Sequence, residues 1–294
     1  MMQGPEAVGY RVHRPSGSNG DLIYLTTTRG IIIASYAQGR VVGSISWYSR
    51  GNYICSDPTN GNVFIREGDT IYEYAHGAVS PMATLTLSGY YITGGCSVDP
   101  TTGNLAQAAV SQGRDPKAVV LVYSGGQGAP TPYADKRIQT FGYPAYDDAG
   151  NLFVPANLKR VFRIAELPTG KSAFTLIKTP NVTGVVSKIQ WVGRYLALEL
   201  HYDSGGNAID QIQISGRRGR VVSSTPILRA ASAYFWIQDG SVVGLSSRIR
   251  LHNDQALAIW PYPSGGEPSD KFYGMTKGRK DRAYDVTVSI APSR

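Results

Sequence analysis

The chain has 294 residues, of which 42% are hydrophobic and 17% are charged, and its formal net charge at pH 7 is +8. This composition supports a large folded core and excludes an intrinsically disordered chain. The apolar runs are about five residues long, whereas a membrane helix needs roughly 20, so the sequence predicts no membrane span. The first 20 residues lack the basic and apolar regions of a secretory signal, so the compartment stays unknown at this point.

A short turn phrase recurs along the chain. Clear copies are DPTNGN at residues 57–62, DPTTGN at 99–104 and DDAGN at 147–151, and looser copies fall at residues 19–21, 192–194 and 239–241. The six turn glycines lie about 41 to 47 residues apart, which is the period of a four-stranded propeller blade; they are Gly20, Gly61, Gly103, Gly150, Gly193 and Gly240. The sequence therefore predicts an all-β, six-bladed β-propeller with four-stranded antiparallel blades, named A to D from the inside outward.

The first repeat lacks its innermost strand. Alternating residues predict strand B over residues 21–26, strand C over 31–36 and strand D over 41–45, with no strand A before them. At the other end of the chain, DVTVSI at residues 285–290 stands where a further strand A would fall. We expect this C-terminal strand to pair with the N-terminal blade, because closure removes the open edges of the ring. The sequence therefore predicts a single domain over residues 19–294, which comes after an N-terminal extension of residues 1–18.

The acidic residues of the turn phrase are interpreted as structural. Asp57, Asp99 and Asp147 begin the A-to-B turns, where an aspartate side chain accepts hydrogen bonds from the backbone two residues on. We therefore withdraw these three residues as candidate catalysts.

Two cysteines, Cys55 and Cys96, come just before the second and third turn phrases. Both should lie on the innermost strands of neighbouring blades, where the register brings them close together. They are either small core residues or the two halves of a disulfide, which an oxidising compartment would permit. None of the four histidines forms a recognisable Cys/His arrangement with them, so a catalytic thiol is not predicted.

These turn phrases, with CSVDPTTGNLA and YPAYDDAGNLFV, resemble the NHL-repeat and SMP-30/gluconolactonase-like six-bladed propellers. The chain is most similar to uncharacterised bacterial propeller proteins, and the resemblance covers residues 21–290. It implies the fold strongly and the activity weakly, because the wider group includes calcium-dependent lactonases, strictosidine-synthase-like enzymes and protein- or RNA-binding modules. Many of the bacterial relatives are exported, which this N-terminus neither supports nor refutes.

The resemblance implies one enzymatic alternative, a lactonase-like hydrolase with calcium at the channel mouth. Such a site needs several oxygen ligands that converge from the inner strands, and lactonases of the group use an early Glu with later Asn and Asp residues. Here Asn52 and Asp285 are the main candidate metal ligands, and they form a thin set. His201 and His252 fall in equivalent B-to-C loops of adjacent blades and are the candidate catalytic residues. Without this activity we expect no cofactor.

The D-to-A and B-to-C loops share one face of the predicted ring, and cations exceed acids on it by about nine. Aromatic residues gather in the same loops, and rings beside cations suit sugars, stacked bases or acidic peptides. The candidate ligand-binding residues are Trp47, Tyr48, Arg50, Tyr53, Tyr91, Tyr143, Tyr146, Lys188, Tyr234, Arg279, Lys280 and Tyr284.

A non-catalytic binding module for an anionic or carbohydrate-like ligand or a protein partner is therefore the predicted function. Nucleic acid fits by charge, but no base-reading motif supports it. The alternative is a purely structural role, in which the aromatic residues fill the channel and the cations are solvent-exposed residues of the rim. A second basic group, ISGRRGRVV at residues 214–222, falls in a C-to-D hairpin on the opposite face and weakens the idea that all cations serve one site.

Overall fold

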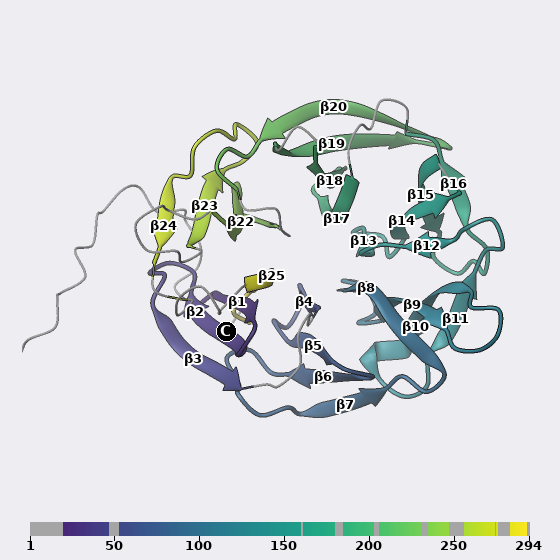
Figure 1. Ribbon diagram of the computed structural model, residues 1–294, viewed down its shortest axis with the longest axis horizontal. Helices are drawn as coiled ribbons and strands as arrows, with labels where there is room; N and C mark the ends of the chain where they lie inside the picture. The colour runs from purple at the N-terminus through teal and green to yellow at the C-terminus, as the bar shows by residue number, and fades with distance from the viewer. Residues whose placement is uncertain are drawn as a thin grey trace, which may run out of the picture.

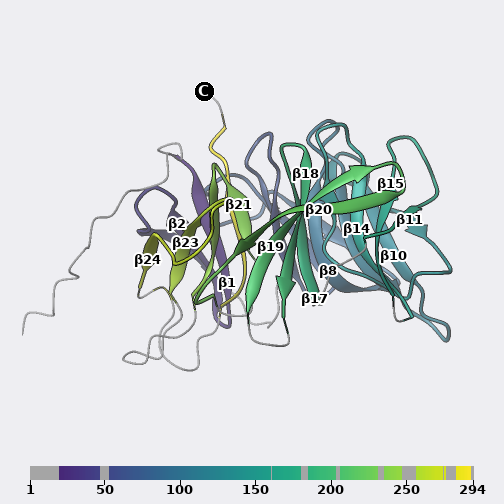
Figure 2. The same cartoon turned by 90° about the horizontal axis from the view of Figure 1, so that it is seen from above.

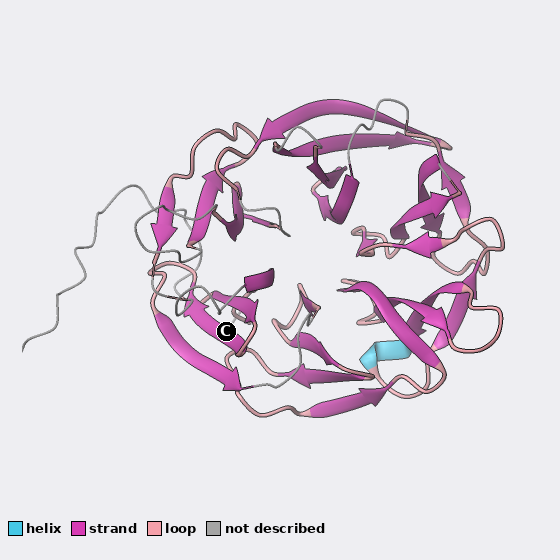
Figure 3. Cartoon of the chain, in the orientation of Figure 1, coloured by secondary structure: helices cyan, strands magenta, loops and turns pink. Residues whose placement is uncertain are grey.

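A computed structural model describes residues 20–46, 53–159, 161–179, 185–202, 206–230, 235–246, 256–273, 275 and 283–292. Six antiparallel sheets stand around a central axis in these ranges, each with its innermost strand toward the middle of the ring (Figure 1). Apart from one 3-10 turn at Ser124–Gly126, the described elements are strands (Figure 3). The predicted all-β, six-bladed propeller is confirmed.

The first three blades each contain four strands, in order from the inside outward. Blade 1 is β25 (Ala283–Ser289), β1 (Leu22–Thr27), β2 (Gly30–Ser35) and β3 (Val41–Ser46). Blade 2 is β4 (Ile54–Ser56), β5 (Val63–Glu67), β6 (Thr70–Tyr74) and β7 (Ala83–Thr86). Blade 3 is β8 (Tyr90–Val98), β9 (Leu105–Ser111), β10 (Ala118–Tyr123) and β11 (Thr131–Ala134).

The other three blades follow the same order, and the innermost strand of blade 4 is split in two. Blade 4 is β12 (Thr140–Phe141) and β13 (Ala145–Tyr146), then β14 (Leu152–Leu158), β15 (Val161–Leu167) and β16 (Thr175–Ile177). Blade 5 is β17 (Val185–Val192), β18 (Tyr195–His201), β19 (Asn207–Ser215) and β20 (Arg218–Pro226). Blade 6 is β21 (Trp236–Gln238), β22 (Ser241–Leu245), β23 (Leu257–Pro261) and β24 (Asp270–Phe272).

The ring is closed by the C-terminal strand, as predicted. β25 pairs antiparallel with β1, in a register that runs from Leu22 opposite Ser289 to Thr27 opposite Ala283. The Asp285 N–H also donates a 2.8 Å hydrogen bond to the Thr26 hydroxyl oxygen. The first blade is thus assembled from the two ends of the domain.

The aspartates of the turn phrase hold the A-to-B turns, which confirms their structural role. Oδ1 of Asp57, Asp99 and Asp147 accepts a hydrogen bond from the backbone N–H two residues on, at 2.7, 2.8 and 2.9 Å. Gly61, in the first of these turns, has φ 74° and lies so near the closing strand that a Cβ would stand 2.1 Å from the Ile290 carbonyl oxygen. A side chain there would push against the closure of the ring.

Apolar packing fills the seams between blades. Six clusters of buried residues lie in the described chain, and each joins two neighbouring blades. In the seam of blades 1 and 2, for example, Tyr24 and Ile31 pack with Ile54 and Ile65. Alternate strand residues thus face one neighbouring blade or the other, which is how the period-2 pattern of the sequence becomes a ring.

The ring has two faces. The face with the A-to-B turns and the C-to-D hairpins is called the turn face, and the face with the D-to-A and B-to-C loops is called the loop face. The chain leaves β25 on the turn face, where the Ala291 N–H donates to Asp21 Oδ1 at 2.8 Å (Figure 2). No helix in the described ranges is long and apolar enough to cross a membrane.

Candidate functional site

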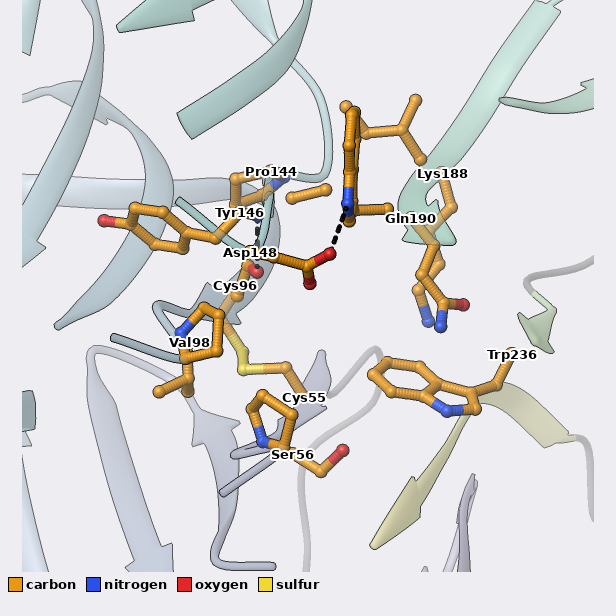
Figure 4. A pocket seen from close by; sticks show the side chains of 16 residues that line it. Cys55, Ser56, Cys96, Val98, Pro144, Tyr146, Asp148, Lys188, Gln190 and Trp236 are labelled. Carbon is orange, nitrogen blue, oxygen red and sulfur yellow. Dashed lines mark hydrogen bonds between the residues drawn. A yellow bond between two sulfur atoms is a disulfide. The ribbon is translucent and has the colours of Figure 1, made fainter. Parts of the chain in front are cut away.

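A cavity of about 150 Å³ opens on the turn face, at the end of the central channel (Figure 4). Pro58, Pro100 and Asp148, which belong to the A-to-B turns of blades 2, 3 and 4, fix its position on this face. The inner strands contribute the rest of the lining, most notably Tyr146, Lys188, Gln190, Trp191 and Trp236. Five blades thus meet at one concave site.

A second cavity of about 290 Å³ adjoins the first on the same face. The two share the lining residues Ser56, Pro58, Gln190, Trp191 and Trp236. Trp191 and Trp236 therefore stand between two connected hollows, which together form the candidate site.

An ion pair crosses the channel beside the site. Lys188 Nζ lies 3.2 Å from Asp285 Oδ1, and these side chains are 4% and 1% exposed. The ammonium also donates to the Val286 carbonyl oxygen at 3.1 Å, and the Tyr143 hydroxyl donates to Asp285 Oδ2 at 3.4 Å. Burial raises the pKa of Asp285, and Lys188 opposes this effect. The positive charge of Lys188 is thus compensated inside the protein.

Aromatic rings enclose the same ammonium. Lys188 Nζ lies 5.1 Å from the centre of the Trp236 ring and 5.6 Å from that of Tyr143. Tyr53 meets the edge of Tyr143 in a T-shaped contact with ring centres 5.4 Å apart. These cation–π contacts hold Lys188 in one position and so fix the wall of the cavity.

A second acid, Glu199 on β18, is buried behind Lys188 and is 3% exposed. Burial raises its pKa to about 8, with Lys188 acting in the opposite direction. Glu199 Oε1 accepts a 2.8 Å hydrogen bond from the Phe235 N–H, whereas Oε2 has no partner. Burial therefore favours the protonated form of Glu199.

Most polar groups of the lining are already paired. Trp191 Nε1 donates to Asp148 Oδ2 at 3.2 Å (Figure 4), and the Gln190 side chain binds the backbone of Ile237 as both donor and acceptor, at 2.8 and 2.9 Å. The exception is Trp236, whose buried Nε1–H has no hydrogen-bond acceptor. One wall residue of the site therefore contains a buried donor without a partner.

The predicted ligand residues fall in different places. Tyr146 and Lys188 line the cavity on the turn face, not the loop face to which they were assigned, and Lys188 is a buried ion-paired residue instead of a rim cation. Tyr143 is buried beneath Lys188, and Tyr284 lies half-buried in β25. Tyr91 is 57% exposed at the loop-face end of β8, away from this cavity.

The remaining predicted site residues lie outside the described residues, and their assignment stays a prediction. These residues are Trp47, Tyr48, Arg50, Asn52, Tyr234, His252, Arg279 and Lys280. His201 is described, and its Nδ1 lies 2.9 Å from Asn207 Oδ1. Asp285, the described candidate metal ligand, is bound to Lys188. In the described ranges no three His, Cys, Asp or Glu residues are grouped to hold a metal ion.

Cys55 and Cys96 form a disulfide that joins β4 of blade 2 to β8 of blade 3, with a Cα–Cα distance of 5.6 Å. The interpretation as two unbonded core residues is therefore wrong, although both residues are buried. The bond also lines the cavity beside Tyr146. The two cysteines lie close together because each stands just before a turn phrase, at matching places on neighbouring inner strands.

Trp191, Trp236 and Glu199 were not among the candidate residues from the sequence. The tryptophans precede the turn glycines Gly193 and Gly240 by two and four residues, on inner strands that lead to the turn face. They stand at different distances from the turn glycine, so no repeated pattern in the sequence indicates them. Glu199 lies within an alternating strand and gives no signal either.

No family model matches the chain, and no curated protein matches it significantly. Solved structures do resemble it. A protein of unknown function from Bacteroides caccae has a TM-score of 0.60 at 12% identity, over 92% of this chain and 99% of that one. TolB from Acinetobacter baumannii has a TM-score of 0.58 at 13% identity, over 90% and 67%.

The β-propeller domain of Cps50 (Swd1) from Myceliophteria thermophila has a TM-score of 0.57 at 11% identity, over 91% of this chain and 86% of that one. At these identities the likeness supports the propeller fold and nothing finer. The resemblance to NHL-repeat and SMP-30-like proteins stays a prediction.

Proposed function

We propose that this propeller is a non-catalytic binding module that takes a neutral, carbohydrate-like ligand at the channel mouth on the turn face. The observation that carries the proposal is Trp236, a residue that lines both cavities and whose buried Nε1–H has no acceptor. A buried donor without a partner costs about 1–3 kcal/mol. A ligand oxygen at this point would recover that free energy.

The shape and chemistry of the lining support a sugar. Tyr146, Trp191 and Trp236 offer aromatic surface, and such rings stack against the C–H faces of flat rings. Phe153 stacks on Trp191 with ring centres 5.8 Å apart, which holds the indole in place before a ligand arrives. A preorganised wall loses little conformational entropy on binding.

The charges favour a neutral ligand over an anionic one. The charged residues of the two linings are Lys188, Asp148 and Asp239, and Lys188 is compensated by Asp285. An anion would meet two carboxylates and no free cation there. Sugar hydroxyls, by contrast, donate to carboxylates and accept from Trp236, so both kinds of group are satisfied.

The lactonase-like alternative has no comparable support in the described chain. No histidine lines either cavity. The Ser56 hydroxyl donates to the Val288 carbonyl oxygen at 2.7 Å, and Asp285 is bound to Lys188. The loop face, where that activity was predicted, falls largely outside the described residues.

The test begins with an array of neutral and acidic glycans, followed by calorimetric titration of the best neutral oligosaccharide. Trp236→Phe keeps the ring and removes the N–H, and it should weaken binding by about tenfold, the equivalent of one hydrogen bond. Trp191→Ala should weaken it further, because a stacking wall is lost.

Tyr91→Ala is the matched control, since it removes an exposed aromatic ring at the loop-face end of β8 and should leave the affinity unchanged. Loss of binding in Tyr91→Ala with full binding in Trp236→Phe would move the ligand to the loop face and overturn the proposed site. Retention of no neutral glycan on the array would overturn the proposed ligand class.

A further inference from the structure

A separate cavity of about 380 Å³ lies at the outer rim of the ring, between blades 4 and 5. There the C-to-D hairpin of blade 5, which joins β19 to β20, reaches the end of β16 (Figure 1). The Lys178 N–H donates to the Arg217 carbonyl oxygen at 3.0 Å, and the Gly219 N–H donates to the Lys178 carbonyl oxygen at 2.8 Å. This short parallel bridge fixes the hairpin against the neighbouring blade.

The lining of this rim groove is basic. It consists of Arg137, Phe174, Thr175, Leu176, Lys178, Arg217 and Arg218, and contains no acidic residue. Arg137 is paired with Asp135, whose pKa the guanidinium lowers. In the described part of the chain, the side chains of Lys178, Arg217 and Arg218 take part in no salt bridge. Three uncompensated cations therefore face one small hollow.

The side chains of Lys178, Arg217 and Arg218 are exposed, so water screens part of their mutual repulsion. The backbone bridge prevents the hairpin from moving away as a whole, so the cations share the groove despite their mutual repulsion. Phe174 and Leu176 supply an apolar wall, which reduces the screening by water. A compact anion with more than one charge would interact with all three cations at once.

We propose that the rim groove binds a phosphate group, presented either by a phosphomonoester or by inorganic polyphosphate. A phosphomonoester carries about −1.5 to −2 charge at pH 7, so it matches three cations better than a carboxylate or a sulfate does. Guanidinium groups bind phosphate oxygens in a bidentate manner, and two arginines that pair with no carboxylate in the described ranges, Arg217 and Arg218, line the groove. An acidic peptide would need cations spread along a surface, whereas these line one groove.

The experiment titrates the full chain with tripolyphosphate and with O-phosphoserine, which distinguishes the two sources of the phosphate group. The double variant Arg217→Gln/Arg218→Gln should weaken binding of the preferred probe at least about tenfold, because two charge-assisted contacts are lost. Arg220→Gln is the control: it lies in the same hairpin and removes one of the two charges that the double variant removes, but it does not line the groove. It should leave the affinity within about twofold.

Two further arms identify the anion. Affinity for O-phosphoserine should fall as the pH is lowered through about 6, where a phosphomonoester gains a proton, since the groove contains no histidine. Affinity for a sulfated sugar should not change over that range. Tighter binding of a poly-glutamate peptide or of the sulfated sugar would overturn the proposal, as would equal binding by the double variant. Trp236→Phe should bind phosphate normally, so this result is independent of the carbohydrate site.

Discussion

Two links between inner strands, one covalent and one ionic, hold the channel in different ways. Cys55–Cys96 joins β4 to β8 across a seam that apolar side chains already fill. Lys188–Asp285 joins β17 to β25, which belong to blades 5 and 1 and have blade 6 between them. Packing therefore accounts for contacts between neighbouring blades, while contact across the channel depends on a polar group long enough to reach. We therefore expect that breaking the ionic link lowers the free energy of unfolding more than removing the disulfide does.

The largest effect should come from breaking the ion pair. Asp285→Ala leaves Lys188 buried without its carboxylate, and loss of one partner of a buried pair costs about 3–5 kcal/mol in the free energy of unfolding. Denaturation with urea measures the loss. Asp69→Ala, an exposed aspartate, is the control and should change stability by less than about 0.5 kcal/mol. A cost for Asp285→Ala no greater than that of the control would show that the pair does not hold the channel.

Removal of the disulfide should cost less. Cys55→Ala/Cys96→Ala frees a loop with a sequence separation of 41 residues, and this should lower the free energy of unfolding by about 2–4 kcal/mol. The wild-type chain under reducing conditions should unfold at nearly the same denaturant concentration as the double variant. A variant as stable as the oxidised chain would mean that packing at this seam makes the bond redundant.

Glu199, which is buried beside the ionic link, should make the free energy of unfolding depend on pH. Its pKa is raised from 4.5 to about 8 in the folded chain, so between these values the folded state holds a proton that the unfolded state has released. The free energy of unfolding should therefore fall as the pH rises through this window, by up to about 1.4 kcal/mol per pH unit, and level off above it. Glu199→Gln should lack this slope. Urea denaturation of both proteins at several pH values measures it, and parallel curves would rule out the raised pKa.

The smallest effect should come from a neutral seam contact. The Ser56 hydroxyl of β4 donates to the Val288 carbonyl oxygen of β25 at 2.7 Å, which links blades 2 and 1 without charge or covalent bond. Ser56→Ala should cost about 1 kcal/mol in the free energy of unfolding. Thermal unfolding with Ser80→Ala, an exposed serine, as control would measure the difference. A loss as large as that of Asp285→Ala would remove the distinction between seam and channel.

The predictable part of this molecule was the part encoded locally. Asp99, Thr101 and Gly103 specify one turn within five residues, and DVTVSI specifies a strand by its own alternation, so blade count and closure followed from the sequence. The candidate site was not local in this sense. Lys188 and Asp285 are 97 residues apart, and their contact depends on the diameter of the ring and on the side chain that each inner strand turns inward. For this reason Lys188 was interpreted from the sequence as a cation at the rim of the ring.

The tryptophans of the channel mouth show the same limit. Trp191 reads from the sequence as an ordinary half-buried strand residue, because nothing nearby indicates that Asp148 of the preceding blade will accept its N–H. Trp236 is indicated even less, since its distinguishing property is the lack of a partner. Whether each indole N–H finds an acceptor depends on how the blades are arranged around the axis, and local sequence patterns do not describe that arrangement.

Closure of the ring by β25 also sets the order of events during synthesis. β1 precedes the other described strands of the propeller, yet its inner partner is made only after the intervening strands of all six blades. Until then β1 carries an unpaired inner edge, which can pair with other chains. A nascent chain stalled before residue 283 would hence be a ring with a gap, most in need of a chaperone until β25 is made.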